Sequence, residues 1–289
     1  MDDLTLLDMI IDPFTLPFMR DALLITLMVS VPAAILSCLL VLKGWSLMGD
    51  AVSHAILPGV VLAYMTGIPL IVGAFAAGMI CSLAAGFLQE NSRVKRDTVL
   101  GVVMSGMFGL GIVLYTAIRS EVHLDHILFG NMLGVGPRDL LVSGSISVIV
   151  TVGLLLSWRD QLLYAFDPIQ ARVSGLPVAV LHYGLLAALS LTVVAMLTSV
   201  GIILAIGLLI APGATAFLLT RRFGRMMVVS VAVTLASVVA GVWISFWMDS
   251  APAATIILVL SAAFTAAFIY RQAEVRRHGR TPPQQPLPR

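Results

Sequence analysis

Long apolar runs separated by short polar stretches dominate this chain. Five windows contain no Asp, Glu, Lys or Arg, namely residues 22–42, 98–118, 140–158, 226–248 and 250–270. A helix needs about 20 predominantly apolar residues to cross a membrane. Each of these windows therefore predicts one membrane-spanning helix.

Two longer charge-free windows, 51–89 and 173–220, are each long enough for two crossings. Gly and Pro mark turns, so the first window should break at Thr66–Pro69, which reads TGIP. We place the second break near Ser199–Gly201. The pattern predicts an all-α polytopic transmembrane helical bundle with nine spanning helices, or eight if one of the close-set segments is re-entrant or folds as a half-helix.

Composition supports a membrane protein with a single membrane domain over residues 1–270. Of the 289 residues, 59% are hydrophobic and only 11% are charged, whereas soluble proteins have about 25% charged residues. Cys38 and Cys81 both lie in apolar segments, which argues against a disulfide framework or a thiolate zinc site. The N-terminus carries aspartates where a cleavable signal would carry basic residues, so we expect the first span to direct membrane insertion.

The distribution of Lys and Arg predicts the orientation of the chain. With nine crossings and a cytoplasmic C-terminus, 14 of the 17 basic residues lie in inside loops, as the positive-inside rule requires. We therefore expect a multi-pass protein of the cell inner (plasma) membrane. The proline-rich polar segment 271–289 is predicted to be a disordered cytoplasmic tail.

Several enzyme classes lack their signatures in this sequence. There is no GxxxxGK[ST] phosphate loop, no G-x-S-x-G elbow, no HExxH and no CxxC. Asp50 has no second aspartate within a span for intramembrane proteolysis, and five histidines are too few for paired haem ligands. We therefore predict a transport protein rather than an enzyme, and no nucleic-acid partner.

Asp50 and His54 are the most informative polar residues, because they begin an otherwise apolar segment, GDAVSHAILPGV. Residues four apart share one helix face, so a carboxylate and an imidazole can point at one spot. These ligands suit Mn²⁺, Fe²⁺ or Zn²⁺, and an ionisable group inside a membrane segment costs about 2.5–3.5 kcal/mol, so it is usually functional. The alternative is that Asp50 caps the helix and His54 is a core histidine.

A second informative stretch, AFDPIQARVSGLPVAV, lies in the predicted inside loop at about residues 159–180. Asp167 and Pro168 form a helix-start signal. A short helix from Ile169 to Ser174 should then end at Gly175. Such a helix across the mouth of a transporter could be moved by a motor subunit, although an ordinary amphipathic connector would have the same pattern.

The loop between the fourth and fifth predicted spans is predicted to face outward. It holds Glu121, His123, Asp125 and His126. Two imidazoles and two carboxylates so close together could form a low-affinity metal entry point, or simply a solvated polar loop.

Together, GDAVSHAILPGVVLAY, FDPIQARVSGLP and HILFGNMLGV resemble the membrane permease subunits of ABC-type importers for manganese, iron and zinc. The resemblance extends from residue 13 to about residue 270. It implies that Asp50 and His54 are metal ligands in the translocation path. It also implies an ATPase-coupling helix whose residues are Phe166, Asp167, Pro168, Gln170, Ala171 and Gly175. The LDHILFGNMLGV segment looks like the manganese/chelated-iron branch, which favours Mn²⁺ and Fe²⁺ over Zn²⁺.

The partners that this resemblance implies are an ATP-binding ABC subunit, a second permease copy or paralogue, a periplasmic metal-binding protein and membrane lipid. No permanently bound cofactor is expected, only the transported divalent ion. Two alternatives stay open from the residues alone. One is a secondary transporter or cation channel, which an inverted internal repeat would favour, and the other is a structural or assembly membrane protein.

Overall fold

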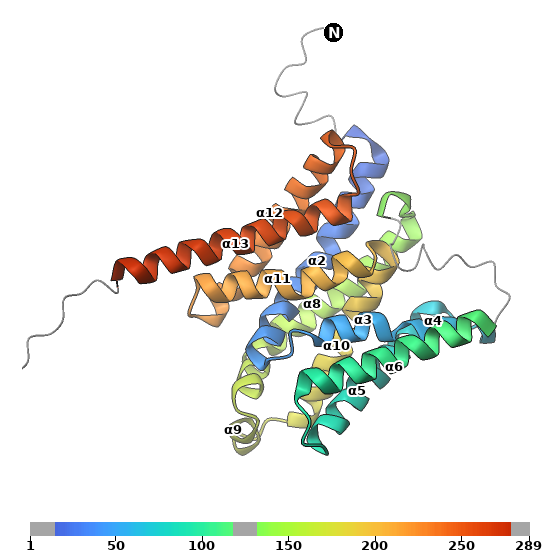
Figure 1. Cartoon of the computed structure of the whole chain (residues 1–289), viewed down its shortest axis with the longest axis horizontal. Coiled ribbons are helices and arrows are strands. Elements are labelled where there is room, and N and C mark those ends of the chain that lie inside the picture. Colours follow the sequence, from blue (N-terminus) through green and yellow to red (C-terminus); the bar gives the residue numbers. More distant parts are fainter. Residues whose placement is uncertain (1–14, 118–131, 279–289) are drawn as a thin grey trace, which may run out of the picture.

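The computed structural model describes residues 15–117 and 132–278, and within these ranges the chain is helical with no β-strand (Figure 1). The elements are α2 (Pro17–Lys43), α3 (Met48–Ala55), α4 (Leu57–Thr66), α5 (Leu70–Glu90), α6 (Arg96–Ala117), the short 3₁₀ helix η1 (Met132–Gly134), α8 (Pro137–Phe166), α9 (Pro168–Val173), α10 (Val178–Ser199), α11 (Ile202–Leu219), α12 (Phe223–Trp247) and α13 (Pro252–His278).

The described part of the chain contains nine helical segments long and apolar enough to cross a membrane, in agreement with the prediction. One of them, residues 48–66, consists of α3 and α4 in succession. Both predicted breaks are confirmed, because Gly67 follows α4 with φ 72° and Gly201 precedes α11 with φ 84°. Glycine adopts this left-handed backbone without the steric cost that a Cβ brings.

The predicted inside loop is shorter than expected. Helix α8 continues to Phe166, so residues 159–166 form its last turns rather than the start of a loop at residue 159. Arg159 and Asp160 ended the apolar window, but charged residues keep helical backbone geometry once the helix has left lipid. The connection to α10 therefore consists mainly of α9.

The predicted disordered tail is wrong for its first residues. Helix α13 runs through Arg271 to His278, and the Arg271 guanidinium donates to the Glu274 carboxylate on the same helix face. This i,i+3 pair supports helix continuation beyond the apolar segment. Residues 279–289 lie outside the described residues.

Helix α2 forms the centre of the bundle, and it packs closely against α11 where Pro212 interrupts the backbone hydrogen bonds of that helix. The Ser37 hydroxyl donates to the Ile210 carbonyl at 3.2 Å and accepts from the Gly213 N–H at 2.9 Å. A Cβ on Gly213 would lie 2.5 Å from the Ser37 backbone, so only glycine permits this approach.

Helices α4 and α5 meet backbone to backbone at Gly59 and Gly73. A Cβ on Gly59 would lie 2.1 Å from the Gly73 carbonyl oxygen, and a Cβ on Gly73 would lie 2.2 Å from that of Gly59. Small residues allow such close helix contacts in membranes, where packing drives association. This contact fixes α4, and with it the end of α3, against α5.

Replacement of Gly73 by alanine should therefore destabilise the purified protein by about 1–3 kcal/mol, the usual cost of overpacking. Gly86 is the matched control, since it lies in the same helix with open space around its Cβ position. Gly86→Ala should leave Tm unchanged or raise it slightly, because alanine has the higher helix propensity. Thermal unfolding in detergent measures both variants, and equal Tm values would contradict the role of the contact.

Candidate functional site

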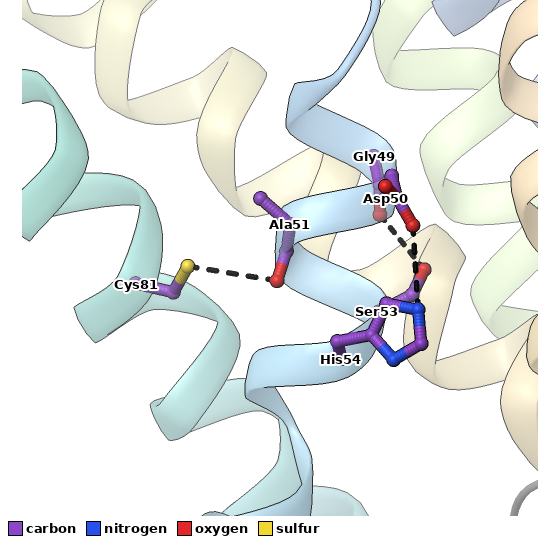
Figure 2. A network of polar contacts seen from close by, with 6 residues as sticks. All are labelled: Gly49, Asp50, Ala51, Ser53, His54 and Cys81. Carbon is purple, nitrogen blue, oxygen red and sulfur yellow. Dashed lines mark hydrogen bonds and ion pairs between the residues drawn. The ribbon is translucent and has the colours of Figure 1, made fainter. Parts of the chain in front are cut away.

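The structure places Asp50 and His54 side by side on one face of α3, as the spacing predicted (Figure 2). The His54 Nε2 atom lies 3.4 Å from the Asp50 Oδ1 atom. The side chains are 33% and 29% exposed, so both can reach a ligand beyond the surface of this chain. An oxygen and a nitrogen donor thus converge in a largely apolar span.

The alternative roles of the two residues do not fit this geometry. The N-cap position of α3 is Leu47, and no side chain caps the helix there. Asp50 lies inside the first turn, where a negative charge interacts favourably with the helix dipole, but its carboxylate faces His54. His54 is not a core histidine either, since its side chain is half-buried and reaches the surface.

Phe108 of α6 contacts His54 from the neighbouring helix. The two ring centroids lie 5.6 Å apart with an interplanar angle of 83°, an edge-on arrangement. Such contacts restrict ring orientation. No pattern in the sequence predicted Phe108, because the register between α3 and α6 is a tertiary property.

The remaining polar groups of α3 are satisfied within the protein. The Ser53 hydroxyl donates to the Gly49 carbonyl at 2.8 Å, and the Cys81 thiol of α5 donates to the Ala51 carbonyl at 3.7 Å (Figure 2). Helix α11 covers the same region, since a Cβ on Gly49 would lie 2.8 Å from the Leu209 side chain. The helix is therefore held firmly while the Asp50–His54 pair stays accessible.

Two side chains cannot complete the coordination of a divalent metal ion. No group of three or more His, Cys, Asp or Glu residues within ranges 15–117 and 132–278 could hold one. Any ion at this pair needs further ligands from water, main-chain oxygens or another chain.

The predicted outer-loop cluster of Glu121, His123, Asp125 and His126 lies outside the described residues. Its role as a metal entry point stays a prediction.

Helix α9 forms where the FDPIQARVSGLP motif predicted a short helix. The Asp167 Oδ1 atom accepts from the Ile169 and Gln170 N–H groups, both at 2.9 Å, and Pro168 occupies the first turn. The helix ends one residue earlier than predicted, at Val173, and Gly175 follows with φ 80°.

One face of α9 is buried and the opposite face is apolar and open. Ala171 is fully buried, in a small cluster with Tyr164 and Leu181. By contrast, Ile169 and Val173 are 77% and 76% exposed. Phe166, just before the helix, is 66% exposed. Exposed apolar residues grouped at the end of a bundle are typical of a protein-docking surface.

Comparison with known proteins identifies the family. Residues 15–271 match the ABC 3 transport family. The chain belongs to this family. The match covers eight of the nine described spans in full and the ninth as far as residue 271, and it includes α3 and α9, so the resemblance based on the sequence motifs is confirmed.

Individual relatives agree with this assignment. The chain is similar to the chelated iron transport system membrane protein YfeD of Yersinia pestis, with 49% identity over 265 residues that cover 92% of this chain and 89% of that protein. It is also similar to the manganese transport system membrane protein MntB of Synechocystis sp., with 43% identity over 263 residues that cover 90% and 85%.

A solved structure shares the fold. PsaBC from Streptococcus pneumoniae, in complex with Fab, contains a chain with a TM-score of 0.83 and 32% identity, and the alignment covers 93% of this chain and 98% of that one. The predicted fold class, an all-α ABC importer permease, is therefore confirmed, and the chain is a multi-pass membrane protein of the ABC transporter type.

The Asp167 side chain caps the N-terminus of α9. Asp167→Ala removes the acceptor for two helix N–H groups, which costs about 1 kcal/mol, whereas Asp167→Asn keeps a capping oxygen. Amide hydrogen exchange over residues 168–173 should become about fivefold faster in the alanine variant and change little in the asparagine variant. Unchanged exchange in both would mean that α9 is held by its packing alone.

Proposed function

We propose that this chain is the membrane permease subunit of an ATP-driven importer that translocates divalent metal ions, with Mn²⁺ and Fe²⁺ favoured over Zn²⁺. The observation that carries the proposal is the Asp50–His54 pair, which presents a carboxylate and an imidazole from one face of α3 inside a membrane span. The names of the manganese and chelated-iron relatives support the choice of ion.

The ligand chemistry supports a transported ion rather than a resident one. Zn²⁺ binds a nitrogen/oxygen site more tightly than Mn²⁺ does, so selectivity must come from geometry and from the protein that delivers the ion. Two ligands from each of two permease chains would give four, which leaves an octahedral ion incomplete. Water or main-chain oxygens complete it, and an ion held this loosely can leave the path.

The proposed partners follow from the two surfaces. A second permease copy or paralogue brings its own pair toward Asp50 and His54, and a periplasmic metal-binding protein delivers the ion from outside. An ATP-binding ABC subunit docks on the apolar face of α9. With the C-terminus in the cytoplasm of an inner-membrane protein, α9 lies on the side where ATP is available.

ATP hydrolysis takes place in the separate subunit and moves α9, which alternates the exposure of the ion path. A channel or a secondary transporter has no need for a helix that is anchored at Ala171 and exposes apolar side chains to water. The docking surface therefore favours the ATP-driven importer over these alternatives.

Replacement of the ligands tests the ion path. We expect His54→Ala and Asp50→Asn each to abolish manganese and iron uptake by cells that express the whole transporter. Changing a group that only orients a metal ligand lowers metal affinity or activity about 10- to 100-fold. Loss of a ligand itself should lower uptake by more than this. Asp97→Asn is the control, because Asp97 is an acidic residue in the first turn of another helix, α6. Near-normal uptake by both ligand variants, at wild-type membrane levels, would sink the assignment.

Replacement of Gly175 tests the docking helix. Gly175→Asp adds a charge and a strained backbone next to the proposed ATPase contact, so we expect normal membrane insertion but loss of the ATPase on purification, or hydrolysis without uptake. Gly67→Asp is a matched control, since Gly67 has a similar φ of 72° and equally open surroundings away from α9. An intact, fully coupled Gly175→Asp transporter would show that α9 is only a connector.

A further inference from the structure

A group of cations and aromatic rings lies where the ends of α2, α6, α8 and α10 meet near α9. It consists of Lys43, Trp45, Arg96, Tyr164 and His182, which we call the cation–aromatic cluster. The Lys43 Nζ atom lies 3.2 Å from the centroid of the Tyr164 ring and 4.6 Å from that of Trp45. The Arg96 Cζ atom lies 5.2 Å from the Trp45 ring centroid. None of its residues is one of the proposed metal ligands or ATPase-coupling residues.

One end of the cluster rests on α9. Tyr164 is buried against Ala171, the one residue of α9 that is buried, and against Leu181 of α10. The Tyr164 hydroxyl lies 2.6 Å from the His182 Nδ1 atom, within hydrogen-bonding distance. A displacement of α9 therefore reaches the Tyr164 ring directly.

The other end of the cluster leads into α3. Lys43 is the last residue of α2, and the Arg96 guanidinium donates to its carbonyl at 3.2 Å. The buried Trp45 follows, and its backbone N–H donates to Leu40 at 2.7 Å while its carbonyl accepts from Met48 at 2.9 Å. Since α3 begins at Met48, the position of Trp45 determines how the helix with the metal ligands enters the bundle.

The contacts of Lys43 are with ring faces rather than with acidic groups. Within the described residues, no Asp or Glu forms an ion pair with Lys43. The acidic residues Asp21, Asp50 and Glu274 pair instead with Arg20, His54 and Arg271, respectively. An ammonium group over an aromatic face is attracted by the ring quadrupole, more strongly where water is partly excluded. Lys43 thus joins a ring from α8 to a ring from the α2–α3 turn. A basic residue that only stabilises a helix C-terminus acts through its charge and requires no contact with an aromatic ring.

We propose that Lys43 is a positioning residue for metal transport, whose ammonium links Tyr164, which rests on α9, to Trp45, which leads into α3 and its Asp50–His54 pair. This inference rests on the proposed function and deepens it, because it names the contact through which movement at α9 reaches the ion path. Each step of this route is a direct contact or a covalent connection: Ala171 to Tyr164, Tyr164 to Lys43, Lys43 to Trp45, and Trp45 to α3.

The test uses the complete transporter, with its ATPase and binding protein, in proteoliposomes supplied with Mn²⁺. The readout is Mn²⁺ taken up per ATP hydrolysed. A merely structural role lowers uptake and hydrolysis in proportion, since fewer intact complexes remain, and leaves this ratio unchanged. A positioning role lowers the ratio itself.

We expect Lys43→Met and Tyr164→Leu each to lower the ratio about fivefold, as for the loss of a partly buried cation–aromatic contact. Lys43→Arg and Tyr164→Phe keep the cation and the ring, so they should retain most of it. Lys95→Met is the control, because Lys95 is an exposed lysine just before α6. Should Lys43→Met fail to assemble, Tyr164→Leu tests the same contact from the other side.

The double variant decides whether the two residues act as one unit. Lys43→Met with Tyr164→Leu should lower the ratio no further than either change alone. A wild-type ratio in Lys43→Met or Tyr164→Leu, a defect in Lys43→Arg as large as in Lys43→Met, or independent multiplication of the two effects would overturn the inference. A wild-type transporter that moves no Mn²⁺, Fe²⁺ or Zn²⁺ would instead overturn the proposed function, so the two failures are distinguishable.

Discussion

The absence of water in the bilayer core is the constraint on which the rest of this structure depends. Helices satisfy their own backbone groups there, and many hydroxyls bond back to their own helix, as Thr26 does to Ala22 at 2.7 Å and Ser82 to Gly78 at 2.9 Å. Asp50 and His54 differ from these, because they satisfy one another only across 3.4 Å and stay part-exposed. Under the proposed function, this part-exposed pair is where the transported ion binds.

Close packing between small residues holds that pair in place. The backbone contact of Gly59 with Gly73 fixes α4 on α5, and the Ser37–Gly213 contact fixes α11 on α2. Helix α3 lies between these two tight joints, with Gly49 against Leu209 of α11. The α2–α3 turn at Trp45 leads into the N-terminal end of α3 and takes no part in either of these contacts.

Local features of the sequence predicted the local features of the structure. The breaks at Gly67 and Gly201 and the cap at Asp167 could be predicted because each depends on the conformation of a few neighbouring residues. The shared face of Asp50 and His54 follows from helix periodicity alone. The contacts of Phe108 with His54 and of Lys43 with Tyr164 could not be predicted, since they depend on the register between helices distant in sequence. The predictions of a loop from residue 159 and a tail from residue 271 are wrong because charges mark where lipid ends, not where a helix ends.

The Asp50–His54 pair and the exposed face of α9 each have the opposite polarity to what their position in the chain would lead one to expect. The Asp50–His54 pair is polar within an apolar span, whereas Ile169 and Val173 are apolar side chains exposed on the short helix α9, which is not one of the spans. Each arrangement is costly in isolation, the first because hydrocarbon does not solvate charge and the second because water does not favour exposed apolar side chains. Under the proposed function one cost is offset by the metal ion with a second permease chain, and the other by the ATPase. Coupling of transport to ATP hydrolysis then requires a physical connection between the Asp50–His54 pair and α9. The contacts from Ala171 through Tyr164 and Lys43 to Trp45 form a continuous connection of this kind.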